Sequence, residues 1–334
     1  ADQIGLFPAT EEAPGAFPLK PPRAGPYHRH ARSRTTSHVS PWPSEASELR
    51  HAQTGDFSQS LVAGVHELSV RVNQPHVRNA PSLELAELRA QAAVAHVRAI
   101  VPVTHGATAA LVNEAGLVLP VLDYEHVPGD TAEAARYDAL RPSFGDSGSP
   151  RLPAGLNLGR QLAWLQARFP ADFARAQHVL MYPQYWAWRL GGVAASEVTS
   201  LGCHTDLWQP ERRQWSSLTQ AQGWATKFPP LRQAWARLGR LRPELVADTG
   251  LPPDCEIVCG IHDSNASLLR HLLTLPERGP CTVLSTGTWV IAAALGSATK
   301  PLVESQDMLA NCNVFGDAVP CMRFMGGREF GAIA

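Results

Sequence analysis

Strand-like and helix-like patterns alternate along the chain from residue 98 onward. Short apolar runs at 98–105 and 256–261 are typical of buried strands. Apolar residues at 158, 162, 165 and 169 follow the three- and four-residue spacing of one helix face, which Pro170 ends. This alternation of strands and amphipathic helices predicts the α/β class.

Two β-hairpins are expected within the same part of the chain. The first turns at 113–116, and the second, "CTVLSTGTWVIAAALG", has its tip at 285–288. Further helices are expected in four segments: 61–70, 82–97, 183–192 and 231–246. The helix at 183–192 should stop at its two terminal glycines. Its tryptophans and Trp289 are interpreted as core residues, because aromatic side chains at helix or strand spacing usually pack inside.

The N-terminal region differs in composition from the rest. Residues 8–43 are rich in Pro, His, Arg and Ser, without a period that could bury one face. Such a segment buries too little apolar surface to offset its ordering entropy, so residues 1–55 are expected to be poorly ordered. Two domains are expected after it, one over 56–275 and the beginning of another over 279–334.

Composition excludes some partner classes. The chain is 44% hydrophobic and 18% charged, with a net charge of −1, so neither nucleic acid nor an acidic membrane surface is an expected partner. We find no apolar run long enough to span a bilayer and no N-terminal signal pattern, which predicts a cytoplasmic location. The six scattered cysteines predict buried free thiols, with no disulfide framework and no metal site.

Asp263 stands where an apolar run meets the start of a helical segment, in "CGIHDSNASLL". One interpretation is a helix cap, in which the carboxylate accepts an unpaired amide hydrogen of the first turn. The other is a proton acceptor. About twenty residues later, the "STGTW" tip could turn backbone amides and hydroxyls toward a phosphate, although such a tip is also an ordinary turn. A base and a phosphate-facing loop together would suit phosphoryl transfer.

Four collinear segments then resemble one family. They are "VTHGATAALVNEAGLVLPVLDYE", "MYPQYWAWRLGGVAASEVTSLGCHTDLWQPERRQWS", "VCGIHDSNASLL" and "TVLSTGTWVIAAALG". Together they resemble consecutive regions of the FGGY carbohydrate kinases, which have the actin/hexokinase/Hsp70-like ATPase fold built of RNase H-like domains. The pairing of His-Asp-Ser with Ser-Thr-Gly-Thr-Trp is most similar to the rhamnulokinase and fuculokinase branch. The resemblance therefore implies an ATP-dependent kinase that phosphorylates a ketose or deoxyketose.

The resemblance also implies roles for individual residues. Asp263 takes the place of the general base that accepts the proton of the attacking sugar hydroxyl. The implied sugar-binding residues are His105, Gly106, Asp123, Tyr124, Glu125 and His262. The implied phosphate-binding residues are Thr286, Gly287 and Thr288. For His105, Asp123 and Glu125 the alternative is a polar strand end, and His262 could be a polar neighbour alone. The implied ligands are ATP, Mg²⁺ and a small sugar, and a homodimer is left open.

Two departures from the family pattern stand beside this resemblance. No D-x-G-T/S strand and turn, whose acid organises Mg²⁺ in the family, precedes Val101, and the glycine-rich adenosine-binding segment of the second domain is not found before Ala334. We therefore expect a first domain that is mostly present and a second that is only begun. The alternative to a working kinase is a catalytically inactive fragment or a sugar-binding remnant.

Overall fold

The computed structural model describes residues 97–286, 289–299, 302–324 and 326, together with the backbone of three earlier strands. These strands are β1 (Gly5–Pro8), β2 (Asp56–Ala63) and β3 (His66–Asn73). The rest of the expected poorly ordered segment 1–55 and the expected helix at 82–97 lie almost entirely outside the described residues. Within the described part, no helix is long and apolar enough to cross a membrane.

Short strands at the centre of the molecule pair in parallel. The apolar run at 98–105 forms β4 (Ala99–Ile100) and β5 (Val103–Thr104), interrupted at Pro102, which has no amide hydrogen for the ladder. The run at 256–261 likewise forms β12 (Glu256–Val258) and β13 (Ile261–His262). β4 pairs with β12 and β5 with β13, both in parallel. The expected strands are thus present, each divided into two pieces.

The expected hairpin at 113–116 is confirmed in a neighbouring sheet. β6 (Ala109–Asn113) pairs antiparallel with β7 (Gly116–Leu117) and on its other side with β8 (His178–Met181). Its residues Ala109 and Leu111 are buried in the same core cluster as the apolar face of α4 (Leu158–Arg168), the helix expected before Pro170. The proline does not end the helical region, because it occupies the first turn of α5 (Pro170–Arg175), where its missing amide hydrogen costs nothing.

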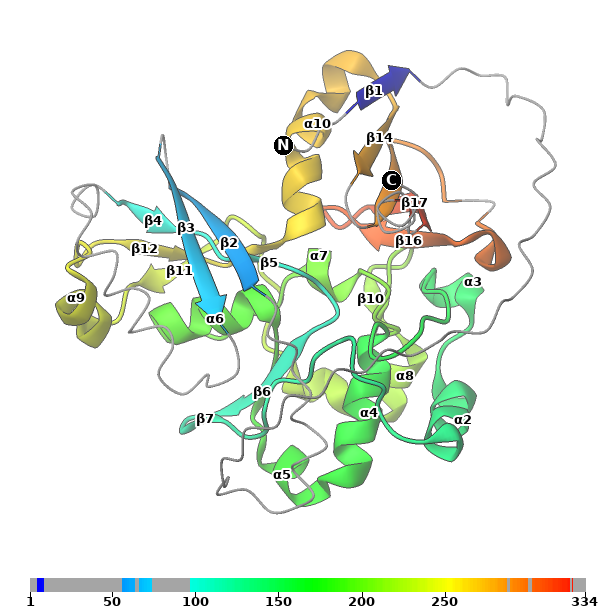
Figure 1. Ribbon diagram of the computed structural model, residues 1–334, viewed down its shortest axis with the longest axis horizontal. Coiled ribbons are helices and arrows are strands. Elements are labelled where there is room, and N and C mark those ends of the chain that lie inside the picture. The colour runs from blue at the N-terminus through cyan, green and yellow to red at the C-terminus, as the bar shows by residue number, and fades with distance from the viewer. Residues whose placement is uncertain are drawn as a thin grey trace, which may run out of the picture.

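The helix expected at 183–192 is confirmed as α6 (Tyr182–Gly191), which ends at Gly192 with a left-handed φ of 84°. Smaller elements surround these layers: α2 (Thr131–Leu140), α3 (Phe144–Ser147), α7 (Val198–Leu201), β9 (Trp208–Gln209), β10 (Gln214–Trp215), α8 (Ser217–Ala221) and the 3₁₀ turn η3 (Trp224–Lys227). Figure 1 shows α4, α5 and α8 grouped below the central strands and α6 beside β4, β11 and β12.

The C-terminal part is a five-stranded antiparallel sheet in the order β1-β14-β15-β17-β16. Its strands are β14 (Cys281–Thr286), β15 (Val290–Leu295), β16 (Met308–Cys312) and β17 (Ala318–Phe324), with the 3₁₀ turn η4 (Glu304–Gln306) before β16. The pairing of Thr286 with Val290 confirms the second expected hairpin. α10 (Asp263–Arg278) packs on the inner face of this sheet and joins it to the central strands (Figure 1).

Two expected helices are wrong. Residues 61–63 and 66–70 belong to the antiparallel pair β2 and β3, consistent with the alternation of Leu68, Val70 and Val72, which has the period of a strand. Residues 231–246 form β11 (Arg237–Arg240), which pairs with β12 through a bulge, and then the start of α9 (Pro243–Thr249). Gly239, with a φ of 144°, and Pro243 at the first helical position prevent one continuous helix.

Candidate active site

The parallel pairing of β5 with β13 brings two distant segments together. Thr104 lies opposite His262, so the turn that follows β5 lies beside the start of α10. A Cβ atom placed on Gly106 would lie 3.0 Å from Nε2 of His262, which is closer than carbon and nitrogen normally approach. Glycine at this position therefore lets the turn close against the histidine ring, and the "THG" turn lies in contact with the "HD" pair.

Asp263 is the first residue of α10, and its side chain is 52% exposed. Its Oδ1 atom accepts a hydrogen bond from the backbone amide of Ser264 at 2.6 Å and lies 3.2 Å from Nε2 of His262. The N-cap position itself belongs to His262. Asp263 therefore binds one amide of the first turn with one carboxylate oxygen, and Oδ2 is left for another partner.

The histidine beside this carboxylate is buried and neutral. Burial lowers the pKa of His262, and nearby His105 lowers it further, although the charge of Asp263 acts in the opposite direction. A neutral ring carries one hydrogen, and Nδ1 lies 3.5 Å from the side-chain nitrogen of Asn265, a donor. Nε2, the nitrogen then left to carry the hydrogen, faces Oδ1 of Asp263 at 3.2 Å. The imidazole and the carboxylate are therefore in close polar contact beside the hydrogen bond from the Ser264 amide.

A second buried carboxyl group lies beneath the same joint. Thr199 Oγ1 accepts the backbone amide of His262 at 3.1 Å and donates to Oε2 of Glu197 at 2.5 Å. Glu197 is 0% exposed, and burial raises its pKa to about 7, although its hydrogen bonds to Thr199 act in the opposite direction. Its other oxygen, Oε1, has no hydrogen-bond partner among the described residues. The backbone that carries Asp263 is therefore supported by a hydrogen-bonded chain.

His105 lies on the other side of the Gly106 turn. Its ring contacts those of Tyr124 and Tyr182, with centroids 5.2 Å and 5.1 Å away. The structure thus gathers His105, Gly106, Tyr124, His262 and Asp263 at one place. An aromatic ring, two imidazoles and a half-exposed carboxylate can together contact the apolar face and the hydroxyls of a small polyol.

The remaining residues of the expected site are Asp123, Glu125 and three residues of the hairpin tip. The carboxylate of Asp123 accepts the backbone amide of Glu125 at 2.8 Å, which closes a local turn, and the Glu125 side chain is exposed. Thr286 is the last residue of β14. Gly287 and Thr288, the other two expected phosphate-binding residues, lie outside the described residues. Roles for all of these residues stay predictions.

Family models match both halves of this arrangement. Residues 154–269 match the N-terminal domain of the FGGY family of carbohydrate kinases, and residues 278–334 match a C-terminal domain of carbohydrate kinase FGGY. The chain belongs to the FGGY family of carbohydrate kinases. The first match ends at residue 269 and the second begins at residue 278, so the boundary between them falls within α10, after the base candidate Asp263 and before the β14–β15 hairpin.

Curated relatives of this FGGY chain include L-fuculokinases. The protein from Escherichia coli K12 is 26% identical over 232 residues, which are 67% of this chain and 47% of the relative. The Haemophilus influenzae protein is 30% identical over 172 residues, which are 48% of this chain and 34% of the relative. The chain spans about half the length of the curated relatives it matches.

Solved structures confirm the expected fold class. A carbohydrate kinase from Novosphingobium aromaticivorans is 41% identical, with a TM-score of 0.72 over 82% of this chain and 58% of that one. Glycerol kinase from Plasmodium falciparum, solved with ADP, is 11% identical, with a TM-score of 0.60 over 80% of this chain and 58% of that one. The fold of the FGGY chain is therefore that of the actin/hexokinase-like ATPases.

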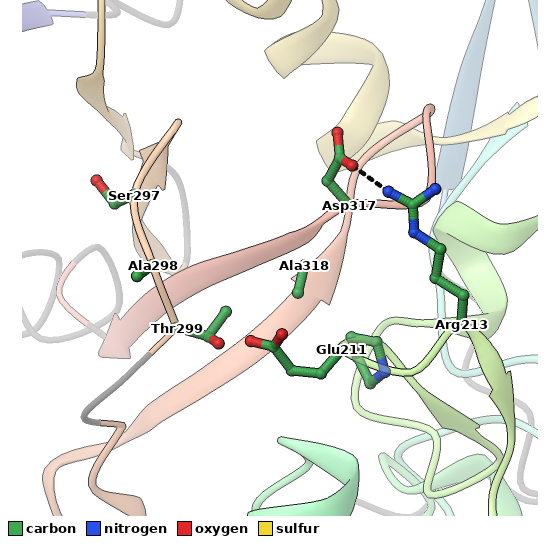
Figure 2. A pocket seen from close by; sticks show the side chains of 8 residues that line it. Glu211, Arg213, Ser297, Ala298, Thr299, Asp317 and Ala318 are labelled. Carbon is green, nitrogen blue, oxygen red and sulfur yellow. Dashed lines mark hydrogen bonds and ion pairs between the residues drawn. The ribbon is translucent and has the colours of Figure 1, made fainter.

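A pocket of about 460 Å³ lies away from Asp263. Its lining residues come from the turn between β9 and β10, from the segment after β15 and from the start of β17: Pro210, Glu211, Arg213, Ser297, Ala298, Thr299, Asp317 and Ala318. Leu295 pairs with Cys281, so this pocket is at the opposite end of the β14–β15 hairpin from its tip. Figure 2 shows the guanidinium of Arg213 directed at the carboxylate of Asp317, with which it forms an ion pair. We take the residues around Asp263, and not this pocket, as the candidate active site. Only the Asp263 group combines a hydrogen-bonded carboxylate with the residues expected to contact a sugar.

Sequence reasoning missed Glu197, Thr199 and Arg323, all of which lie near this group. Thr199 reaches His262 through the packing of α7, which no local pattern reveals. A signal for Arg323 does exist in "AVPCMRF", where it continues the alternation of the buried residues Val319 and Cys321. Trp289, interpreted as a core residue, is partly exposed and lies beneath the Arg323 guanidinium, 5.0 Å from its central carbon.

Proposed function

We propose that this chain forms the sugar-binding and proton-accepting part of an ATP-dependent kinase. The reaction transfers the γ-phosphoryl group of ATP to a hydroxyl of a ketose or deoxyketose such as fuculose or rhamnulose. Membership of the FGGY family and similarity to the L-fuculokinases support this assignment. The acceptor sugar is the finer part of the proposal, since the identities to named relatives are between 26% and 30%.

One observation carries the mechanism: the two oxygens of the Asp263 carboxylate have different roles. Oδ1 is held by the Ser264 amide and faces His262 Nε2, whereas Oδ2 has no such bond and belongs to a half-exposed side chain. A carboxylate fixed in this way can accept a proton through Oδ2 from a hydroxyl placed about 3 Å away. Removing that proton as the hydroxyl oxygen attacks phosphorus is the help that phosphoryl transfer requires of a base.

The neighbours of Asp263 would place the acceptor. His105 and Tyr124 lie beyond the Gly106 turn and present a ring edge and polar atoms on the side from which a sugar would approach. His262, held neutral by burial, places no positive charge beside the Asp263 carboxylate, 3.2 Å from its Nε2 atom. The neutral imidazole can therefore contact the base candidate without forming an ion pair with it.

ATP and Mg²⁺ enter this proposal through the family. Within the described ranges, no group of three or more His, Cys, Asp or Glu side chains converges on one point. In kinases Mg²⁺ is held largely by phosphate oxygens, water and one or two carboxylates, and it neutralises charge on the transferring group. The described residues therefore fit the role of accepting the proton, and we assign no step of the proposed reaction to residues that hold the metal.

The test is phosphorylation of purified ketoses by the protein and by its Asp263→Asn variant, with exposed Asp248→Asn as the matched control. We expect kcat for L-fuculose or L-rhamnulose to fall about 10²- to 10⁴-fold in Asp263→Asn, with sugar binding nearly unchanged, and to remain unchanged in Asp248→Asn. Retention of more than about a tenth of the activity would exclude Asp263 as the base. Binding of the sugar without turnover in the unaltered protein would favour the inactive sugar-binding alternative.

A further inference from the structure

Arg323 occupies a position on β17 where an apolar residue is the usual choice. Alternate residues of this strand face inward, and Val319 and Cys321 are 4% and 3% exposed. Arg323 is next in that row, pairs with Ile291 on β15, and has a side chain that is only 13% exposed. A buried guanidinium is costly unless its charge and its donors are matched. The partners of Arg323 therefore decide what it does.

The described partners satisfy only part of this guanidinium. Nη2 lies 3.6 Å from Oδ1 of Asp307, which is too far for a hydrogen bond, and the Asp307 side chain is 67% exposed. Nε is buried and has no hydrogen-bond acceptor within the described part of the chain. One face of the group stacks on the ring of Trp289. A planar cation with five N–H donors is thus held in place with donors to spare.

Arg323 lies at the same end of the C-terminal sheet as Asp263. α10 runs from Asp263 to Arg278, and the chain reverses at Gly279 to enter β14, so the first turn of α10 lies near the far end of β14 at Thr286. Arg323 pairs at that end, since Ile291 lies one residue from the Thr286–Val290 pair.

Cys203 and His204 follow α7, which packs against β16 of this sheet. The thiol of Cys203 lies within reach of both charges: burial raises its pKa, Asp263 raises it further, and Arg323 lowers it. His204 donates Nδ1–H to the Leu156 carbonyl at 3.0 Å, and its pKa is lowered to about 4 by burial and also by His262 and Arg323. Both the cation and the base candidate therefore lie close enough to Cys203 to influence its thiol.

We propose that Arg323 is an anion-binding residue that takes a phosphate oxyanion with its unused N–H donors. The ring of Trp289 orients the guanidinium, and Asp307 competes weakly for it from the solvent side. A planar guanidinium is well suited to two oxygens of one phosphate group. The source of that phosphate, either the nucleotide or the phosphorylated sugar, follows from the proposed kinase function, on which this part of the inference rests.

The test is calorimetric binding of sodium tripolyphosphate to the full chain. Arg323→Met keeps an unbranched side chain that can pack on Trp289 but removes the charge and all donors, and we expect its Kd to rise about 10- to 100-fold. Asp307→Asn removes the competing carboxylate and keeps a residue that tolerates the φ of 56° at this position. We expect this variant to bind about two- to fivefold more tightly.

Arg278→Gln is the matched control, because it removes an exposed arginine from the opposite end of α10 and should leave Kd unchanged. A purely structural Arg323 predicts a lower melting temperature in Arg323→Met with an unchanged Kd, and that result would overturn the proposal. If Arg323→Met does not fold, Asp307→Asn decides: an unchanged or higher Kd overturns the proposal. The highest tripolyphosphate concentration in this assay is about 10 mM, roughly ten times a millimolar Kd. If the unaltered chain does not bind tripolyphosphate up to that concentration, the proposal is also overturned.

Two further ligands identify the source of the phosphate. An effect of Arg323→Met on ATP but not on L-fuculose 1-phosphate assigns the residue to the nucleotide, and the reverse result assigns it to the sugar product. If Arg323→Met binds both ATP and L-fuculose 1-phosphate as tightly as the unaltered chain does, the inference is overturned. Because this assay measures binding, a chain that loses anion affinity in Arg323→Met but phosphorylates no ketose would refute the proposed function and leave the anion site standing.

Discussion

Replacing Glu197 by Gln should change how the stability of this protein depends on pH. Glu197 is fully buried, and burial raises its pKa from 4.5 to about 7. A raised pKa means that the folded state binds more protons than the unfolded state between those two values. The stability contributed by the protonated carboxyl is therefore complete below about pH 4.5 and is lost as the pH rises through about 7.

The magnitude follows from the size of that shift. At about 1.4 kcal/mol for each pKa unit, the ionised group destabilises the folded state by about 3 kcal/mol, of which about 2.5 kcal/mol falls between pH 5 and pH 8. Gln cannot ionise, so this part of the pH dependence should vanish in Glu197→Gln. The new amide also places N–H donors where Oε1 had no partner, which adds a constant cost of about 1–3 kcal/mol.

Urea unfolding followed by circular dichroism at pH 5, 6, 7 and 8, the points that span the titration of Glu197, measures this difference. The free energies of unfolding of Glu197→Gln and the unaltered protein must be compared at each pH. Burial lowers the pKa of His204 to about 4, so the contribution of His204 to stability rises with pH between about 4 and 6.5. In the unaltered protein this rise hides part of the fall in stability caused by Glu197. His204 is present in both proteins and cancels in the difference. Exposed Glu114→Gln is the control, and its profile should run parallel to that of the unaltered chain.

The reasoning fails if the free energies of unfolding of Glu197→Gln and the unaltered protein differ by the same amount at pH 5 and pH 8, within about 0.5 kcal/mol. Such a result would mean that Glu197 is ionised in the folded state throughout this range. The hydrogen bonds from Thr199 would then stabilise the carboxylate more than burial destabilises it. In that case the Thr199 hydroxyl, which accepts the His262 amide, would donate to an ionised Glu197 carboxylate.

Three other variants test the packing described above. Gly106→Ala should lower sugar affinity about tenfold in a binding titration, because the new methyl group displaces the ring of His262; an unchanged affinity would separate this turn from the site. Asp206→Asn should cost about 3 kcal/mol in urea unfolding, since it leaves the guanidinium of Arg141 buried without its carboxylate, and a cost below about 1 kcal/mol would contradict that role. Trp224→Ala should cost about 3–5 kcal/mol in the same assay, because the indole is 1% exposed, and a near-neutral result would mean that the cavity collapses.

The fold class was predictable because the patterns that define it are local. The hairpin at 281–295 is indicated by its turn residues, and the helix at 158–168 by its apolar spacing. Each signal lies within a window of about fifteen residues. The segment 231–246 misled because its leucines and arginines have helical spacing, whereas Gly239 and pairing with β12 select a strand. Strand pairing with a distant segment overrides local propensity, and no window of the sequence contains that partner.

The same distinction applies to the candidate site. Asp263, His262 and Gly106 were predicted from the resemblance, and the structure places them in contact. Glu197 and Thr199 were missed, because neither the burial of Glu197 nor the contact of Thr199 with His262 can be seen from the neighbouring sequence. Both depend on how α7 packs against distant segments. Domain boundaries and the roles of the remaining site residues stay predictions, because neither the fold nor the family match assigns a function to each side chain.

Parallel pairing explains why residues so far apart in the chain meet at one site. In parallel strands the carboxyl ends lie at the same edge, and ligands of α/β proteins usually bind just outside that edge. β5 ends at Thr104 and β13 at His262, so the residues that follow, His105 and Asp263, emerge together. Within the strands, Val103 and Ile261 pack in the core and set stability. Beyond Thr104 and His262 the backbone leaves the ladder and its side chains become available for chemistry. Asp263 can therefore hold a helix amide with one oxygen and face a substrate with the other.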